Sequence, residues 1–224
     1  MNRKRIVAGI AGAAWLWCGT SVLAADGGDR PMPPYIVSPG ETAAWSITVQ
    51  DKAPPSEGAP PSLRERQVVQ SGGVRRESNK WSDGGQTENW QVNGIWMKED
   101  PQTHTLSLID PAHTAMAALI LREAFLDQSW VGTGTYLRRD KLNGQPCFVY
   151  GRAAANGGAE GAAEEAWIAV DTRLIAFFDD GVRTYRFQYL PPPSSPPVLP
   201  PRFAGVYRKF QDDLNPLKIP QPPQ

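Results

Sequence analysis

The feature that most constrains the fold is a nearly continuous apolar segment that lies between stretches of alternating sequence. Asp110 is a favoured helix N-cap residue, and Pro111 follows at the first helical position. From Ala115 to Leu126 only Arg122 and Glu123 interrupt the apolar residues. Because a helix that is apolar nearly all round must be buried, we predict a helix over 111–128 against which a sheet curves or is capped.

Most of the remaining chain carries strand and hairpin signals. Residues 44–50, AWSITVQ, alternate apolar and polar side chains, with Trp45 on the apolar side. Asn93-Gly94 and Asn143-Gly144 each predict a two-residue hairpin turn. The first turn would pair Trp90 with Met97 on one face. Residues 165–190 predict three more strands, the last with Tyr185, Phe187 and Tyr189 on one face.

The N-terminus is typical of a cleavable secretory signal. Three basic residues precede a short apolar run, and small residues end it at Ala24 and Ala25. The alternative is a retained anchor, but the apolar run is shorter than the roughly 20 residues that a spanning helix needs. We therefore expect a signal peptide over 1–25 and localisation in the periplasm. The chain left after cleavage is slightly acidic, so it offers no broad cationic surface for nucleic acid. It also has no further apolar segment long enough to span a membrane.

Several segments, taken in order, resemble the LolA-like group of bacterial envelope proteins, which includes lipoprotein carriers and the sensor domain of sigma-E regulators. The similar segments are VVQSGGVRRESNKW, NGIWMKEDPQTHTLSLIDP, GTGTYLRRDKLNGQPCFVYGR, AEEAWIAVDTRLIAFFDDGVRTYRFQYL and PPRFAGV. The chain departs from the family in its proline-rich segment 191–201 and in RLIAFF, where the family commonly has a proline. The carriers' ligand-gating arginine matches no single position.

This resemblance implies a mainly β (α+β) domain over 41–203: a curved, antiparallel, incomplete β-barrel with one or two helices packed in its concave side. A flexible stretch over 26–40 and a tail over 204–224 would flank it. In the carriers, the concave cavity holds lipoprotein acyl chains.

The expected function is that of a periplasmic, non-enzymatic protein that carries or senses an apolar ligand such as a lipid or lipoprotein acyl chain. The 111–128 helix would act as a plug or lid. Acyl chains gain roughly 0.8 kcal/mol for each buried CH₂. The residues expected to contact the ligand are Trp45, Trp90, Met97, Leu119, Ile120, Leu121, Phe125, Trp167 and Phe187. The alternative is an envelope protein-interaction or sensor module with a filled core, which would use the convex face or the proline strip 191–201.

Catalytic and metal chemistry find little support in the sequence. Three roles are open to Cys147: a nucleophile, half of an intermolecular disulfide, or a buried apolar residue. Its predicted position across from Asp140 favours the last, because a nearby carboxylate opposes formation of the reactive thiolate. His104 and His113 flank Asp110 in a spacing that matches no familiar metal site. We therefore expect no catalytic residues, no metal and no cofactor.

Overall fold

Eleven antiparallel strands make up most of the chain that the computed structural model describes, which comprises residues 30–110, 128–153 and 163–214. The strands are β1 (Ala43–Asp51), β2 (Leu63–Ser71), β3 (Val74–Trp81), β4 (Gln86–Val92), β5 (Ile95–Glu99), β6 (Leu106–Ile109), β7 (Tyr136–Leu142), β8 (Gln145–Ala153), β9 (Ala163–Ala169), β10 (Ile175–Asp179) and β11 (Arg183–Leu190). A short 3₁₀ turn, η1 (Thr133–Thr135), precedes β7, and the helix α2 (Pro201–Leu214) follows β11.

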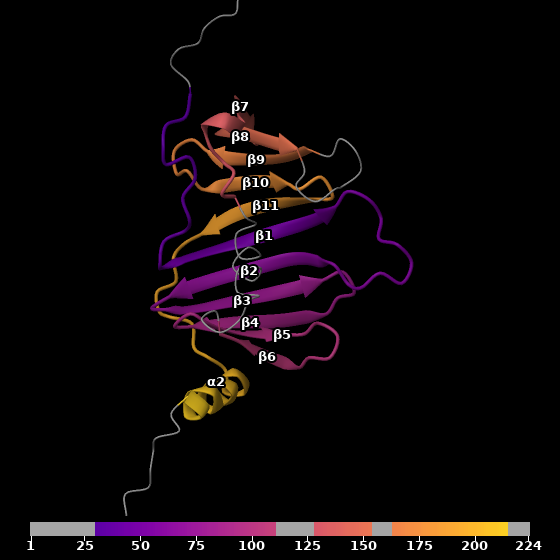
Figure 1. The fold of residues 1–224 in the computed structure, drawn as a ribbon, viewed down its shortest axis with the longest axis vertical. Coiled ribbons are helices and arrows are strands. Elements are labelled where there is room, and N and C mark those ends of the chain that lie inside the picture. The colour runs from indigo at the N-terminus through magenta and orange to yellow at the C-terminus, as the bar shows by residue number, and fades with distance from the viewer. Residues whose placement is uncertain (1–29, 111–127, 154–162, 215–224) are drawn as a thin grey trace, which may run out of the picture. The chain divides into compact units, whose positions relative to one another are not determined.

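The strands form one curved sheet that does not close on itself (Figure 1). Its order is β6-β5-β4-β3-β2-β1-β11-β10-β9-β8-β7. Every neighbouring pair is consecutive along the chain except β1 and β11, where Trp45 lies opposite Tyr189. The sheet therefore consists of two meanders, β1–β6 and β7–β11, joined along β1 and β11.

The two predicted Asn-Gly hairpins are confirmed. Asn93 and Gly94 have φ angles of 50° and 88°, and Asn143 and Gly144 have 51° and 86°. Asparagine and glycine tolerate these left-handed conformations, and such turns match the twist of the paired strands. The first turn sets the register that pairs Trp90 with Met97.

The two faces of the sheet are distinguished by strand alternation. We call the face that carries Trp45 the inner face and the face that carries Trp90 the outer face. The inner face holds the main hydrophobic cluster on β1 and β8–β11, and Tyr35, Ile36, Trp130 and Val131 from the connecting segments pack against it. The main core therefore lies on the inner face.

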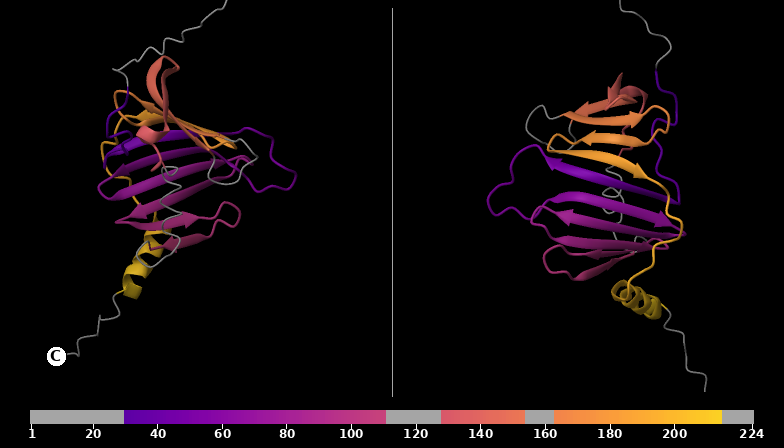
Figure 2. Two further views of the ribbon diagram at one scale, coloured as in Figure 1. Left: turned by 45° about the horizontal axis from the view of Figure 1, so that its top comes forward. Right: turned by 180° about the vertical axis from the view of Figure 1, so that it is seen from behind.

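Helix α2 packs against the outer face next to β5 and β6 (Figures 1 and 2). Its Phe203 is 3% exposed and lies 6.0 Å from Trp90, measured between ring centroids. The proline-rich segment 191–200 runs along the strand ends from β11 to this helix. It passes so close to the β2–β3 turn that a Cβ on Gly72 would lie 3.2 Å from Cγ of Pro196.

The predicted mainly β class and the curved, unclosed antiparallel sheet are confirmed. The helix predicted over 111–128 and the signal predicted over 1–25 lie outside the described residues, apart from Gln128. Helix α2 was not predicted, and it crosses position 204, where a tail was expected to begin. Its apolar residues Phe203, Val206, Tyr207 and Phe210 have helical spacing, so the missed signal was present in the sequence.

Candidate functional site

The inner face of β1 and β8–β11 is lined by buried aromatic and branched side chains. Trp45 and Tyr150 are fully buried, and Phe148 is 5% exposed. Strand register places these residues on one face, because Phe148 and Tyr150 lie opposite Ile168 and Ala166 on the neighbouring strand. This surface is the most apolar part of the described sheet.

A cavity of about 240 Å³ opens beside this surface, near the 52–62 loop. Its apolar walls come from β1, β2, β3 and β11: Ile47, Val49, Leu63, Trp81 and Tyr185. Arg66 and Arg183 also line it. The Nε of Arg183 donates to Asp51 over 2.8 Å, so this part of the wall is held by an ion pair.

A second cavity, of about 340 Å³, lies near the other end of β11. Its lining combines Leu174, Phe187 and Tyr189 with the polar side chains Gln145, Thr172 and Gln188. The sheet is locally irregular here, because the pairing of β10 with β9 shifts register between Ile175 and Phe177. The Tyr189 hydroxyl donates to the Ile175 carbonyl over 2.9 Å. Ala169 also lines this cavity, and strand register places it and Gln188 on the outer face, so the cavity is lined from both faces of the sheet.

The other half of the inner face, on β2–β4, is buried but polar. Glu77 is 2% exposed and Arg75 is 7% exposed. Arg75 donates from Nε and Nη2 to Oε1 of Glu77 over 3.0 and 2.7 Å, and Arg66 Nε lies 3.8 Å from Oε2. Asn89 also donates to Glu77, over 3.4 Å. We call this group the Glu77 network.

The Glu77 network keeps its central carboxylate ionised. Burial alone would raise the pKa of Glu77, but the positive charges of Arg66 and Arg75 outweigh that cost, so the pKa lies below its usual value. Burial likewise lowers the pKa of Arg75, against the attraction of Glu77. The guanidinium of Arg75 also lies over the rings of Trp45 and Trp96, at 5.1 and 5.6 Å from their centroids.

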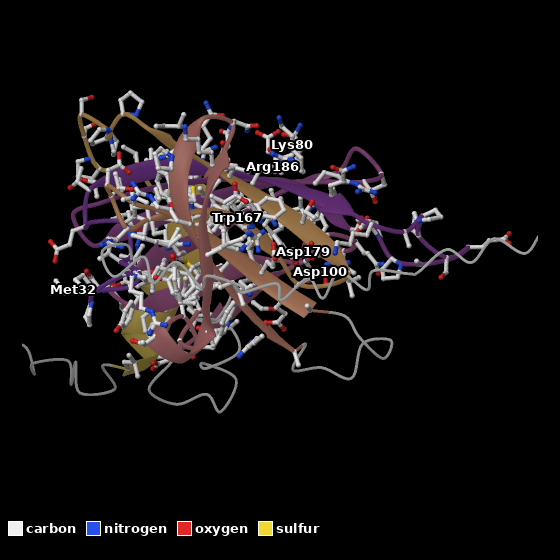
Figure 3. The ribbon with its side chains drawn as sticks, turned by 90° about the horizontal axis from the view of Figure 1, so that it is seen from above. Met32, Lys80, Asp100, Trp167, Asp179 and Arg186 are labelled. Carbon is white, nitrogen blue, oxygen red and sulfur yellow. The ribbon has the colours of Figure 1, made fainter. Side chains whose placement is uncertain are left out.

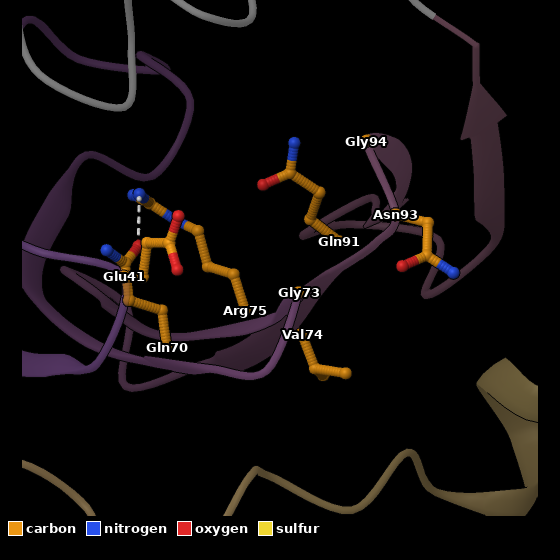
Figure 4. A pocket seen from close by; sticks show the side chains of 8 residues that line it. All are labelled: Glu41, Gln70, Gly73, Val74, Arg75, Gln91, Asn93 and Gly94. Carbon is orange, nitrogen blue, oxygen red and sulfur yellow. Dashed lines mark hydrogen bonds between the residues drawn. The ribbon is translucent and has the colours of Figure 1, made fainter.

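Arg75 borders a polar cavity of about 420 Å³ at the turn end of β2–β5 (Figure 4). Gln70, Gln91 and Glu41 line it with Arg75, and the glycines of two hairpin turns complete its wall. Its lining is mostly amide and charged groups, so this cavity suits a hydrated or polar group better than a hydrocarbon chain.

The structure divides the predicted ligand-contacting residues between the two faces. Trp45 and Phe187 lie on the inner face. Trp90 and Met97 lie on the outer face beneath Phe203 of α2. Trp167, which Figure 3 labels, is also on the outer face by strand register, packed edge-on to Phe177 with Arg138 over its ring at 5.5 Å. Four predicted residues lie outside the described part of the chain: Leu119, Ile120, Leu121 and Phe125.

The Glu77 network was not predicted from the sequence. Arg75, Glu77 and Asn79 alternate along β3 and face the same way. That alternation was readable, but a row of charged and amide side chains predicts an exposed face. Only the tertiary structure shows that this face is buried.

Cys147 behaves as the buried apolar residue that its position across from Asp140 indicated. It is fully buried and unbonded to another cysteine, and burial raises the pKa of its thiol. His104 lies in the β5–β6 connection, with Nδ1 3.0 Å from Oε1 of Glu99. Within the described ranges, no cluster of three or more histidine, cysteine or acidic residues is placed to hold a metal ion. No helix in those ranges has the length and hydrophobicity needed to cross a membrane.

Comparisons with solved structures find similarities at low sequence identity. The chain is similar to the lipoprotein LppX of Mycobacterium tuberculosis, with 10% identity and a TM-score of 0.40 over 71% of this chain and 88% of that one. It is similar to LprF from Mycobacterium bovis, with 12% identity and a TM-score of 0.37 over 72% and 89%. It is also similar to a LolA superfamily protein from Nitrosomonas europaea, with 10% identity and a TM-score of 0.32 over 77% and 94%. No protein-family model and no curated protein sequence matches the chain.

Proposed function

We propose that the chain is a non-enzymatic periplasmic protein that binds an apolar ligand, such as a lipid or lipoprotein acyl chain, on the inner face of its sheet. The observation that carries the proposal is the apolar cavity of about 240 Å³ next to the buried aromatic surface. The periplasmic location follows from the signal expected over residues 1–25.

The sizes of the two cavities, and the mainly apolar lining of the smaller one, suit a hydrocarbon chain. Small-molecule pockets are mostly apolar and occupy roughly 300–1,000 Å³. The cavity beside Val49 and Leu63 approaches the lower end of that range, and the cavity beside Phe187 lies within it. Burial of about six methylenes in either cavity would contribute about 5 kcal/mol. Filling both cavities would contribute about 10 kcal/mol, from which the cost of immobilising the ligand, about 4 kcal/mol or more, must be subtracted.

Only some of the residues predicted to contact the ligand lie on the inner face. Trp45 and Phe187 belong to the surface that would receive the ligand. Trp90 and Met97 pack against Phe203, so in this arrangement they anchor α2 and do not contact the ligand.

Filling the smaller cavity tests the proposal. The chain lacking residues 1–25 would be incubated with oleate and examined by native mass spectrometry and by thermal unfolding. The variant Leu63→Trp fills the cavity from β2, whereas Gln67→Trp adds the same side chain at an exposed position on the outer face of that strand. We expect bound oleate and an increased Tm for the parent and for Gln67→Trp, with weaker binding by at least tenfold for Leu63→Trp.

Equal oleate binding by both variants would place the ligand elsewhere. If neither the parent nor Gln67→Trp binds oleate or extracted envelope lipids, the inner face is a filled core. The protein would then fit the alternative of an interaction or sensor module.

A further inference from the structure

Several polar side-chain atoms of the described residues are buried without a hydrogen-bond partner, and two of them lie beside the same aromatic rings of the inner face. The Tyr150 hydroxyl and Nη1 of Arg173 are both inaccessible to solvent, and neither forms a hydrogen bond with any described residue. Such groups cost about 1–3 kcal/mol each when left unsatisfied, and more when they are charged. Buried polar groups without partners are rare in folded proteins, so these two call for a partner that the chain itself does not supply.

The two groups share one aromatic environment. Tyr150 lies on β8, with its ring centroid 5.8 Å from that of Tyr136 and 6.5 Å from that of Tyr35. The guanidinium of Arg173 lies 4.6 Å from the ring centroid of Phe148, two residues before Tyr150 on the same face. The positive charge of Arg173 acts on the Tyr150 hydroxyl, although burial has the larger effect and raises the pKa of Tyr150 to about 12. Tyr150 is therefore a neutral donor at physiological pH.

The backbone holds Arg173 in place. Arg173 has a φ of 59°, a left-handed conformation that a non-glycine residue adopts at an energetic cost. Its N–H donates to the Ala169 carbonyl over 3.0 Å, and its carbonyl accepts from the Val37 N–H over 2.9 Å. The turn between β9 and β10 thus directs this side chain toward the ring of Phe148.

The chemistry of these groups selects the ligand. A guanidinium and a neutral phenol both donate hydrogen bonds, and the unpartnered Nη1 of Arg173 and the Tyr150 hydroxyl therefore suit an acceptor, best an anionic one. The turn residues on either side of Arg173, Thr172 and Leu174, line the 340 Å³ cavity that would hold a hydrocarbon chain. We propose that Tyr150 and Arg173 bind the anionic head group, a carboxylate or a phosphate, of an acyl ligand whose chain lies on the inner face. This inference rests on the proposed function.

The test compares ligands that share a tail and differ in the head group. Oleate carries a carboxylate, oleoyl lysophosphatidate carries a phosphate, and methyl oleate carries no charge. Their affinities for the chain lacking residues 1–25 would be measured by displacement of a fluorescent fatty acid. The site variants are Tyr150→Phe and Arg173→Met. The control is Arg186→Met, which removes an arginine that lies over Phe177 at 5.4 Å on the outer face.

We expect one or both anionic ligands to bind at least tenfold more tightly than methyl oleate. Each site variant should lose about tenfold to a hundredfold in affinity for that anion, and should leave methyl oleate unchanged. Arg186→Met should match the parent. The preferred anion identifies the head group as a carboxylate or a phosphate.

Thermal stability separates a binding role from a structural one. Because Tyr150→Phe removes an unsatisfied hydroxyl, the ligand-free variant should melt at the same temperature as the parent or higher. A lower Tm would indicate that the hydroxyl has a structural partner and would overturn the proposal. Equal affinity for oleate, lysophosphatidate and methyl oleate would also overturn it and leave the proposed function intact, as expected if a buried water satisfied both donors. Failure of all three ligands to bind would overturn both.

Discussion

The Glu77 network makes a strong prediction about stability. Glu77 is 2% exposed and lies between two arginines, with Nη2 of Arg75 2.7 Å from one carboxylate oxygen and Nε of Arg66 3.8 Å from the other. Glu77→Gln keeps the size of the side chain but removes the negative charge. The two guanidiniums then lose the carboxylate that lies between them.

The expected cost is large on the scale of protein stability. Removal of one partner from a buried ion pair costs about 3–5 kcal/mol, whereas a typical domain is stable by about 5–15 kcal/mol. The control is Glu65→Gln on β2. The Glu65 carboxylate lies 2.8 Å from Nζ of Lys80, but the two side chains are 30% and 55% exposed. An exposed pair of this kind contributes about 0–1 kcal/mol.

The assay is equilibrium unfolding in urea, monitored by tryptophan fluorescence. Glu77→Gln should lower the free energy of unfolding by several times the change seen for Glu65→Gln. An equal decrease in the free energy of unfolding for the two variants would show that the charge balance of the Glu77 network does not stabilise the fold. The double variant Arg75→Met/Glu77→Leu offers a further check, because well-packed apolar residues often replace a buried ion pair at little cost. It should be more stable than Glu77→Gln.

Three more predictions follow from the same structure. The pKa of Glu77 in the folded chain lies below its ordinary value of 4.5, so its contribution to the free energy of unfolding is complete above pH 4.5 and is lost as the pH falls through the lower folded pKa. Below about pH 4, the urea midpoint should therefore fall more steeply with decreasing pH for the parent than for Glu77→Gln. Parallel curves of urea midpoint against pH would contradict this prediction. Phe203→Ala should weaken the docking of α2 by about 3–5 kcal/mol, so amide exchange should accelerate in 201–214 and not in β1; uniform acceleration would show that α2 is integral to the core. Since burial raises the pKa of Cys147, its thiol should react with an aromatic disulfide reagent at pH 8 only after urea is added, and rapid reaction in the native chain would contradict its burial.

Local features of this fold were predictable because local sequence determines them. The Asn93-Gly94 turn requires positive φ at both positions, and these residue types tolerate that conformation. Once the turn is set, the pairing of Trp90 with Met97 follows from the twofold alternation of a strand. The same argument placed Cys147 across from Asp140.

The assignment of faces was not predictable to the same extent. Alternation shows which residues of one strand lie together, but it does not relate Trp45 to Trp90 across intervening strands. The structure places them on opposite faces, with Trp90 under a helix that the sequence reasoning missed. Burial of Arg75 and Glu77 depends on mutual neutralisation, which a pattern of apolar and polar residues does not reveal.

The pairing of β1 with β11 has a consequence for how the chain reaches its native state. Trp45 and Tyr189 are roughly 140 residues apart, so this contact closes by far the longest loop among the strand pairs, and the entropic cost of closure grows with loop length. All other neighbouring strands of the sheet are consecutive along the chain and can pair locally as they fold. The pairing of β1 with β11 should therefore form late in folding, after each meander has assembled. During synthesis, it cannot form until β11 has been made.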